Sequence, residues 1–138
     1  MPLPAFAIDL SVSGSPAEVW ERLWDLDRHT DAVPLTVVSG GPLDRGARFV
    51  GRTRLGPLHV DDVMVVREWE PPHRCVVEKV GRPLGGRIEA TLEPAPGGTR
   101  LRWRQRYEVT GLPDRLVALA RPAVRAAYLL ALRRITRP

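Results

Sequence analysis

Two adjacent carboxylates, Asp61 and Asp62, occur inside the segment LHVDDVMVV. Side chains of a strand alternate between its two faces, so one of these carboxylates must point inward. If Met64 belongs to the core, Asp62 shares its side of the strand. A buried carboxylate is costly unless it is paired, and a wet strand end or an arginine such as Arg52 or Arg54 would meet that need. Alternatively, Asp62 is a candidate catalytic residue, a general acid or base acting on a carbonyl substrate.

A second group of candidates lies in TRLRWRQRYEVTG, residues 99–111, where apolar and charged residues alternate almost without fault. One side of this predicted strand carries Leu101, Trp103, Gln105, Tyr107 and Val109. Most of the set fits a plain core, but a buried amide without partners costs roughly 1–3 kcal/mol. Gln105 therefore needs a backbone group, a water molecule or a ligand. Tyr107 and Tyr128 each join an apolar ring to a hydroxyl that needs a partner, so either could face a ligand.

The other side of the same strand carries Arg100, Arg102, Arg104, Arg106 and Glu108. If Leu92 pairs with Leu101 across the PAPGG turn, Glu93 lies opposite Arg100 and Glu89 opposite Arg104. Opposite charges across a strand pair contribute roughly 0.2–1 kcal/mol each. Nucleic-acid binding normally interleaves aromatic and basic side chains on one exposed face, and here the aromatic residues point the other way. We expect a mostly solvated face and no nucleic-acid partner.

The histidines and the single cysteine do not form a recognisable reactive site. His29 lies beside Asp27 and Asp31 and could titrate near neutral pH, although an exposed loop histidine is the simpler interpretation. His59 and His73 lie at predicted strand ends and have no partner at metal-ligand spacing, so we expect no zinc or iron site. The chain also lacks a nucleophile motif, a phosphate-binding glycine loop and a dinucleotide fingerprint, and no cofactor is expected.

The elements that position these residues follow from periodicity and turn chemistry. Residues 5–13 alternate as a strand, and Ser15-Pro16-Ala17-Glu18 predicts a capping box that starts a helix to about Leu26. Residues 27–31 are expected to form a second helical turn or a loop. Further strands are predicted at 35–39, 47–55, 58–69, 74–80, 87–93 and 99–111, and the Gly, Pro and Asp residues between them indicate an antiparallel meander.

A helix is predicted from Leu112-Pro113-Asp114 to Ile135, with Pro122 as a kink or restart. Its apolar face carries Val117, Ala120, Val124, Ala127, Tyr128, Ala131 and Ile135. Leu119, Leu129 and Leu132 lie on or near the opposite, arginine-bearing side, where a solitary helix would leave them in water. These leucines suggest a self-association face and hence a homodimer.

Composition places the chain among soluble globular proteins. Its 138 residues are 43% hydrophobic and 27% charged, with a net charge of +5, and we expect one domain over residues 1–138. Residues 1–99 hold 11 basic and 14 acidic side chains, giving −3, whereas residues 100–138 hold 10 and 2, giving +8. That basic end could contact an anionic membrane or an acidic partner. No secretory signal or spanning segment is evident and Cys75 is alone, so a cytoplasmic location is expected.

Several short motifs resemble the START-like helix-grip superfamily, in particular its polyketide cyclase/dehydrase and lipid-transport branch. They are Ser15-Pro16-Ala17-Glu18-Val19-Trp20, the Trp69-Glu70-Pro71-Pro72-His73-Arg74 strand end, and the Gly97-Gly98-Thr99-Arg100-Leu101 hairpin. The resemblance implies an α+β helix-grip fold, with a curved seven-stranded antiparallel sheet around a long C-terminal helix and two short helices after strand 1. It also implies a cavity between sheet and helix.

Three functions are consistent with this pattern. The leading hypothesis is binding of a hydrophobic or aromatic small molecule, lipid-like or polyketide-like, in the cavity. Its predicted contacts are Phe49, Met64, Trp103, Gln105, Tyr107, Val124 and Tyr128. The alternatives are an aromatase/cyclase-type enzyme in which Asp62, Gln105 and a tyrosine supply polar chemistry, and an interaction module that docks through the basic C-terminal segment.

Overall fold

The computed structural model describes residues 5–138, which form seven strands and four helices. The strands are β1 (Ala5–Val12), β2 (Thr36–Gly40), β3 (Arg48–Leu55), β4 (Leu58–Glu70), β5 (Arg74–Lys79), β6 (Leu84–Ala95) and β7 (Gly98–Val109). The helices are α1 (Pro16–Leu23), α2 (Leu26–Ala32), α3 (Asp114–Leu119) and α4 (Arg121–Ile135). All seven strands form one antiparallel sheet in the order β1-β7-β6-β5-β4-β3-β2. The predicted α+β helix-grip fold is confirmed.

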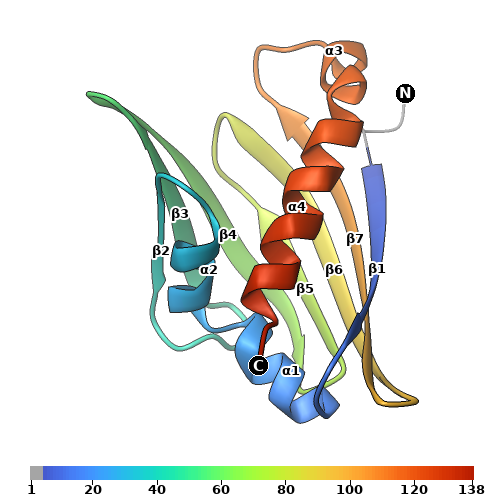
Figure 1. Ribbon diagram of the computed structural model, residues 1–138. Helices are drawn as coiled ribbons and strands as arrows, with labels where there is room; N and C mark the ends of the chain where they lie inside the picture. Colours follow the sequence, from blue (N-terminus) through green and yellow to red (C-terminus); the bar gives the residue numbers. More distant parts are fainter. Residues whose placement is uncertain (1–4) are drawn as a thin grey trace.

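The sheet curves around α4, which crosses its inner face, while α1 and α2 lie beside the C-terminal end of that helix (Figure 1). The hairpin of β3 and β4 projects beyond the rest of the sheet. Inward-facing side chains of β1 and β7 alternate with exposed ones along both strands, as a half-buried strand requires. The core therefore lies between the inner face of the sheet and the helices.

The register of β6 and β7 is the expected one, because Leu92 pairs with Leu101 and Glu93 lies opposite Arg100. The ion pairs differ from the expectation. Asp9 of β1 lies 3.8 Å from the Arg100 guanidinium and 3.5 Å from that of Arg102, and Glu89 is 3.7 Å from Arg74 of β5. Strand β7 lies between β1 and β6, so carboxylates on either neighbouring strand can pair with its arginines.

Strand β6 begins at Leu84, earlier than predicted, and runs through Gly85 and Gly86. Gly86 has a φ of +133°, and a Cβ at this position would lie 2.0 Å from the carbonyl oxygen of Arg106. Only glycine fits such a close approach of two backbones. The glycines that suggested a turn therefore lie within the strand, opposite β7.

The C-terminal helix breaks where Pro122 predicts it, between α3 and α4. The placement of its leucines differs from the expectation. Leu132 is only 1% exposed and Leu129 packs against the core, whereas Leu119 is 78% exposed. The reason is that α4 is not solitary, since α1 and α2 pack against it and cover one of its sides.

Candidate functional site

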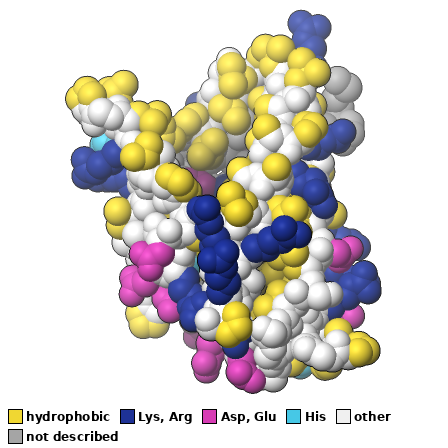
Figure 2. Space-filling model, in the orientation of Figure 1, with side chains coloured by type: hydrophobic (Ala, Val, Ile, Leu, Met, Phe, Trp, Pro, Cys, Tyr) yellow, Lys and Arg dark blue, Asp and Glu magenta, His cyan; other side chains and the backbone are white. Residues whose placement is uncertain are grey.

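A cavity of about 280 Å³ lies between the inner face of the sheet and α4. Figure 2 shows the surface hollowed between the β3–β4 hairpin and the C-terminal helices, with hydrophobic side chains along both sides. Its lining is mostly apolar and aromatic and includes Trp24, Val38, Phe49, Met64, Val77, Ile88, Trp103, Ala131 and Tyr128. We call it the first chamber. Four of the predicted ligand contacts line it, namely Phe49, Met64, Trp103 and Tyr128.

A second chamber of about 360 Å³ lies between the ends of β6 and β7 and the α3–α4 break. Gln105, Tyr107 and Val124, the other three predicted contacts, line this chamber together with Leu116 and Val117. The two chambers share four lining residues, Asp62, Lys79, Leu84 and Tyr128. The predicted contact residues therefore divide into two sets that meet at one polar cluster.

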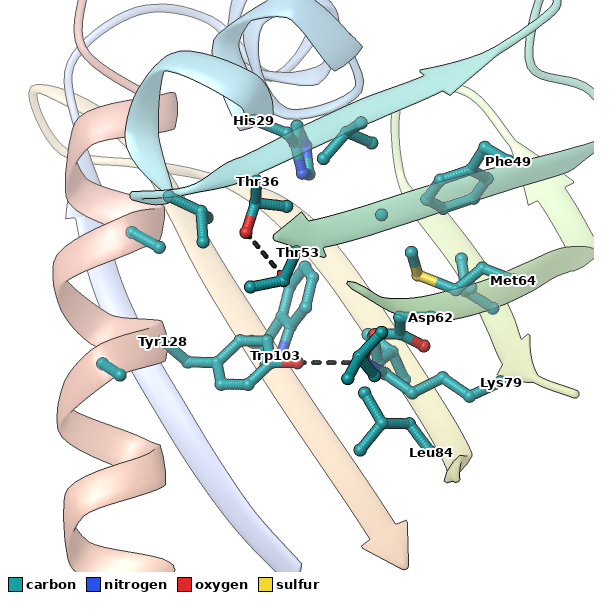
Figure 3. A pocket seen from close by; sticks show the side chains of 18 of the residues that line it. His29, Thr36, Phe49, Thr53, Asp62, Met64, Lys79, Leu84, Trp103 and Tyr128 are labelled. Carbon is teal, nitrogen blue, oxygen red and sulfur yellow. Dashed lines mark hydrogen bonds and ion pairs between the residues drawn. The ribbon is translucent and has the colours of Figure 1, made fainter. Parts of the chain in front are cut away.

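The polar cluster consists of Lys79, Asp62 and Tyr128 (Figure 3). The Lys79 ammonium forms an ion pair with Oδ2 of Asp62 and donates a hydrogen bond of 3.0 Å to the Tyr128 hydroxyl oxygen. The lysine side chain is 5% exposed and the aspartate side chain 17% exposed. Asp62 comes from β4, Lys79 from β5 and Tyr128 from α4, so the cluster connects the sheet to the C-terminal helix.

The partner of Asp62 corrects the sequence interpretation, which offers a wet strand end, Arg52 or Arg54. Arg52 instead pairs with Asp61 on the outer side of β4, at 2.8 Å between Nε and Oδ1. Asp62 faces inward and forms an ion pair with Lys79. A signal for this pairing is present in the sequence, because Lys79 is the single lysine among 21 basic residues and lies in phase with the buried Cys75 and Val77.

The electrostatics keep Lys79 charged. Burial alone would lower the pKa of Lys79, but the nearby Tyr128 and Asp62 oxygens outweigh it and hold that pKa above its usual range. The cluster is thus an ammonium–carboxylate pair with almost no net charge, set in an otherwise apolar wall.

Gln105 is 2% exposed, and its side-chain oxygen accepts a 3.0 Å hydrogen bond from Nε1 of Trp103. This side chain–side chain bond supplies a partner for the oxygen of the buried amide. Trp103 in turn stacks at 6.2 Å and 25° on Trp24, which comes from the end of α1. The Tyr107 hydroxyl donates to the carbonyl oxygen of Val117 at 3.3 Å, so its polar end is also satisfied within the protein.

His29 lies in α2 and lines the first chamber, which corrects the expectation of an exposed loop histidine. Its Nε2–H donates a 2.6 Å hydrogen bond to the Leu23 carbonyl oxygen, and its ring stacks against Trp24. Burial lowers the pKa of His29, against the weaker opposing effects of the Leu23 carbonyl and Asp25. The imidazole is therefore neutral near pH 7.

Two buried side-chain atoms in residues 5–138 have no hydrogen-bond partner, namely Nε1 of Trp24 and Oδ1 of Asp62. Both residues line the first chamber. In the same part of the chain, no three His, Cys, Asp or Glu side chains are grouped closely enough to hold a metal ion. Its helices are also too short or too polar to cross a membrane.

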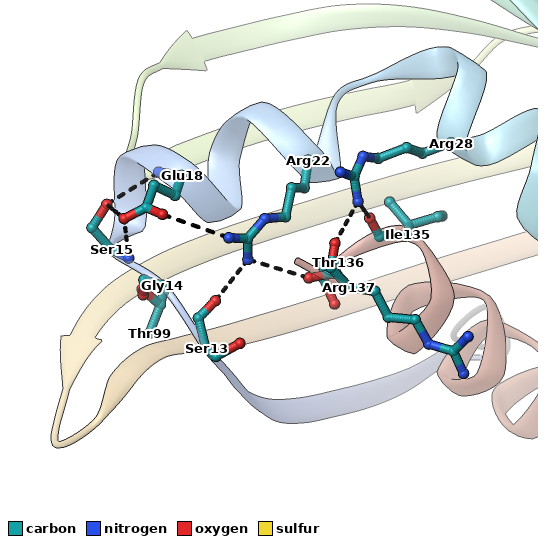
Figure 4. Close-up of polar contacts among 10 residues, drawn as sticks. All are labelled: Ser13, Gly14, Ser15, Glu18, Arg22, Arg28, Thr99, Ile135, Thr136 and Arg137. Carbon is teal, nitrogen blue, oxygen red and sulfur yellow. Dashed lines mark hydrogen bonds and ion pairs between the residues drawn. The ribbon is translucent and has the colours of Figure 1, made fainter.

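Helix α4 is held over the chambers by contacts at its C-terminal end (Figure 4). Arg28 donates to the carbonyl oxygens of Ile135, at 3.1 Å, and Arg137. Arg22 donates to the carbonyl oxygens of Ser13, at 2.7 Å, and Thr136, at 3.4 Å. The last carbonyls of a helix have no partner within it, so arginines are well suited to this place. These contacts hold the C-terminal end of α4 against α1 and α2.

Solved structures with this fold are similar over most of the chain. The di-domain ARO/CYC StfQ from the steffimycin biosynthetic pathway superposes with a TM-score of 0.76 at 15% identity, covering 98% of this chain and 50% of that one. Our chain thus spans about half of that protein. Ara h 8.0201 gives 0.69 at 11% identity, covering 96% of this chain and 97% of that one. A Thermus thermophilus protein, TTHA0849, gives 0.72 at 17% identity, with coverage of 96% and 97%.

Identities this low establish a shared fold only. A search among curated proteins gives no significant match. The sequence profile of one family, described as polyketide cyclase / dehydrase and lipid transport, matches residues 6–137. The chain belongs to the polyketide cyclase / dehydrase and lipid transport family.

Proposed function

We propose that this protein binds a mostly apolar, lipid-like or aromatic small molecule in the first chamber. The observation that carries the proposal is the apolar cavity between sheet and α4, with the Lys79–Asp62–Tyr128 cluster as its polar feature. Ligand sites are typically concave and apolar, with a few polar groups that orient the ligand. Each methylene that a ligand buries here contributes about 0.8 kcal/mol. The family description and the ARO/CYC relative support this chemical class.

The test is binding of the neutral dye N-phenyl-naphthylamine, followed by its fluorescence increase, to the wild type and to Gly51→Val. Gly51 lines the first chamber, and a Cβ there would meet Met64, Thr36 and Val38 at 3.8–3.9 Å, an ordinary contact distance. Valine should therefore fold normally and occupy ligand space. We expect binding about tenfold weaker in this variant.

Gly41→Val is the matched control, because a Cβ at Gly41 meets no atom within 4 Å. It should bind the dye like the wild type. Equal binding by all three proteins would place the dye outside the first chamber and contradict the proposal. Native mass spectrometry of the purified protein, followed by organic extraction, would identify any molecule that it retains.

An enzyme of the aromatase/cyclase kind is the second candidate. It is favoured by Asp62, a carboxylate residue that lines the chamber and whose Oδ1 has no protein partner. Tyr128 lies in the same cluster and carries a second exchangeable proton. If Asp62 is the acid or base, Asp62→Asn should abolish turnover of a poly-β-carbonyl substrate. Unchanged turnover would remove Asp62 from the mechanism.

Contact with an anionic bilayer is a separate proposal. The sequence suggests the whole basic segment of residues 100–138 as the contact surface, whereas the structure favours another surface. Several of the C-terminal arginines are already engaged, Arg100 and Arg102 with Asp9 and Arg125 with the carbonyl oxygen of Ala7. Exposed leucines instead occur on the β3–β4 hairpin, Leu55 and Leu58, and in or just before α3, Leu112, Leu116 and Leu119. Figure 2 shows hydrophobic side chains on both sides of the hollow. The exposed Arg54, Arg115 and Arg121 accompany them.

This rim would insert leucines between lipids while its arginines meet anionic headgroups. We expect cosedimentation with phosphatidylglycerol vesicles, weakened by salt and by Leu58→Ser with Leu119→Ser. Val80→Ser, an exposed valine outside the rim, is the control. Equal binding to neutral phosphatidylcholine vesicles would contradict the role of charge.

A further inference from the structure

A side chain of α4 stands where the two chambers meet. Asp62, Lys79, Leu84 and Tyr128 line both chambers, and of these only Tyr128 comes from the helix. Its hydroxyl oxygen accepts the 3.0 Å hydrogen bond from the Lys79 ammonium on β5. This contact crosses the space between helix and sheet (Figure 3). Tyr128 therefore spans the cavity instead of merely lining one wall.

The other lining residues divide at the same level on two elements. Along α4, Val124 lines the second chamber and Ala131 the first. Along β7, Tyr107 lines the second chamber and Trp103 the first. The division on the helix falls beside Tyr128, which places the side chain of this residue at the boundary between the chambers.

Packing holds the Tyr128 ring in this position, in addition to the bond of its hydroxyl. The ring lies 5.4 Å from that of Phe6 on β1 and 6.3 Å from that of Trp103 on β7, measured between centroids. One turn earlier on the helix, Arg125 donates a 3.0 Å hydrogen bond to the carbonyl oxygen of Ala7, also on β1. The helix is thus tied to the sheet at the level of the boundary.

We propose that the Tyr128 ring closes the first chamber toward the second and thereby limits the length of the ligand that the first chamber takes. This inference rests on the proposed ligand-binding function and adds a residue that determines ligand length. The chambers, of about 280 and 360 Å³, each lie near the lower end of ligand-site volumes, which run from roughly 300 to 1,000 Å³. A smaller side chain at position 128 should join them and admit a longer apolar molecule.

The test is displacement of N-phenyl-naphthylamine by n-alkanols from butanol to tetradecanol. The dye is assigned to the first chamber by its weaker binding to Gly51→Val, so alkanols that occupy only the second chamber do not displace it. Each added methylene should tighten binding to the wild type about fourfold until the first chamber is full, and further methylenes should add nothing. In Tyr128→Ala the affinity should keep rising over several more methylenes.

Two further variants examine the ring and the second chamber separately. Tyr128→Phe keeps the ring, which Phe6 and Trp103 still hold, so the wild-type length limit should remain. Val124 lines only the second chamber, and helix side chains lean toward the N-terminus, away from position 128. Val124→Phe added to Tyr128→Ala should therefore fill the second chamber and restore the shorter limit.

Folding of the variants is checked by the short alkanols, which should bind to all of them about as tightly as to the wild type. Tyr128→Leu, which also lacks the outer part of the ring, replaces Tyr128→Ala if the alanine variant does not fold.

The outcomes separate this inference from the proposal on which it rests. If affinity for the wild type rises through the whole series, if Tyr128→Ala keeps the wild-type limit, or if Tyr128→Phe exceeds it, the ring does not limit ligand length. If Val124→Phe leaves the longer limit of Tyr128→Ala unchanged, the chambers are not joined and the inference is also wrong. In all these cases the binding proposal stands. If neither the dye nor any alkanol binds the wild type, ligand binding in the first chamber fails together with the inference.

Discussion

Replacing Lys79 by methionine should be among the most destabilising single changes in this chain. Methionine has a similar length and no charge, so it fills the space but leaves the Asp62 carboxylate unpaired. The two side chains are only 5% and 17% exposed, so water cannot take over the role of the ammonium fully. Removing one partner of a buried ion pair typically costs about 3–5 kcal/mol. This is a large fraction of a total stability that is usually about 5–15 kcal/mol.

Urea unfolding followed by tryptophan fluorescence measures the effect as a shift of the midpoint at constant slope. Arg52→Met is the matched control. It breaks the ion pair of Asp61, the neighbour of Asp62 on β4, whose side chain lies on the exposed face of the sheet. Exposed ion pairs contribute little, so its midpoint should barely move. The double variant Lys79→Met with Asp62→Leu should recover to within about 1 kcal/mol of the wild type or exceed it, since apolar replacements of buried pairs are often neutral or stabilising.

Two results would contradict this reasoning. If Lys79→Met loses no more stability than Arg52→Met, the Lys79–Asp62 contact is not a buried ion pair in solution. If the double variant stays as unstable as the single one, the loss comes from packing around residue 79 rather than from an unpaired carboxylate.

Three further predictions concern other parts of the structure. Burial lowers the pKa of His29, so on acidification the unfolded chain binds a proton before the folded one does. The free energy of unfolding should therefore be highest above the unfolded pKa of about 6.5 and fall as the pH drops below it. Urea midpoints measured across this pH range should fall less in His29→Gln than in the wild type. Burial raises the pKa of the Cys75 thiol to about 12, so thiol reagents should modify it only after unfolding, and rapid labelling without urea would refute its burial. Ser15→Ala removes the cap of α1, where Ser15 accepts from the Glu18 amide at 3.2 Å, and should lower the free energy of unfolding by about 1 kcal/mol, against no change for the exposed Ser11→Ala.

The fold could be predicted because its signals are local. Alternation along residues 99–109, the capping box at Ser15 and the proline restart at Pro122 each depend on neighbours in the chain, and each is confirmed. The pairing of Leu92 with Leu101 was also accessible, because a tight turn between two alternating strands leaves few registers. Local patterns thus determine which face of each strand is buried.

The candidate site could be predicted only in part, since its central contact joins distant elements. Alternation places Asp62 inward, but its partner lies on β5, and the register of β4 with β5 includes a bulge after Val66. Abundant arginines suggest the wrong partner, whereas the single lysine is the informative residue. The prediction for His29 is wrong because its burial comes from α2 packing over the sheet and α4, which no local pattern encodes.

The position of the Lys79–Asp62 pair is itself an argument about function. A chain selected for stability alone could place two apolar residues there, with equal or better stability. Instead the pair lies where two apolar chambers meet, and one carboxylate oxygen is left without a protein partner. The cost of burying the pair is understandable if the pair orients a ligand at this junction. The double apolar variant Lys79→Met with Asp62→Leu separates the two roles, because it should keep the fold and still bind N-phenyl-naphthylamine but lose any preference for ligands that carry a polar group.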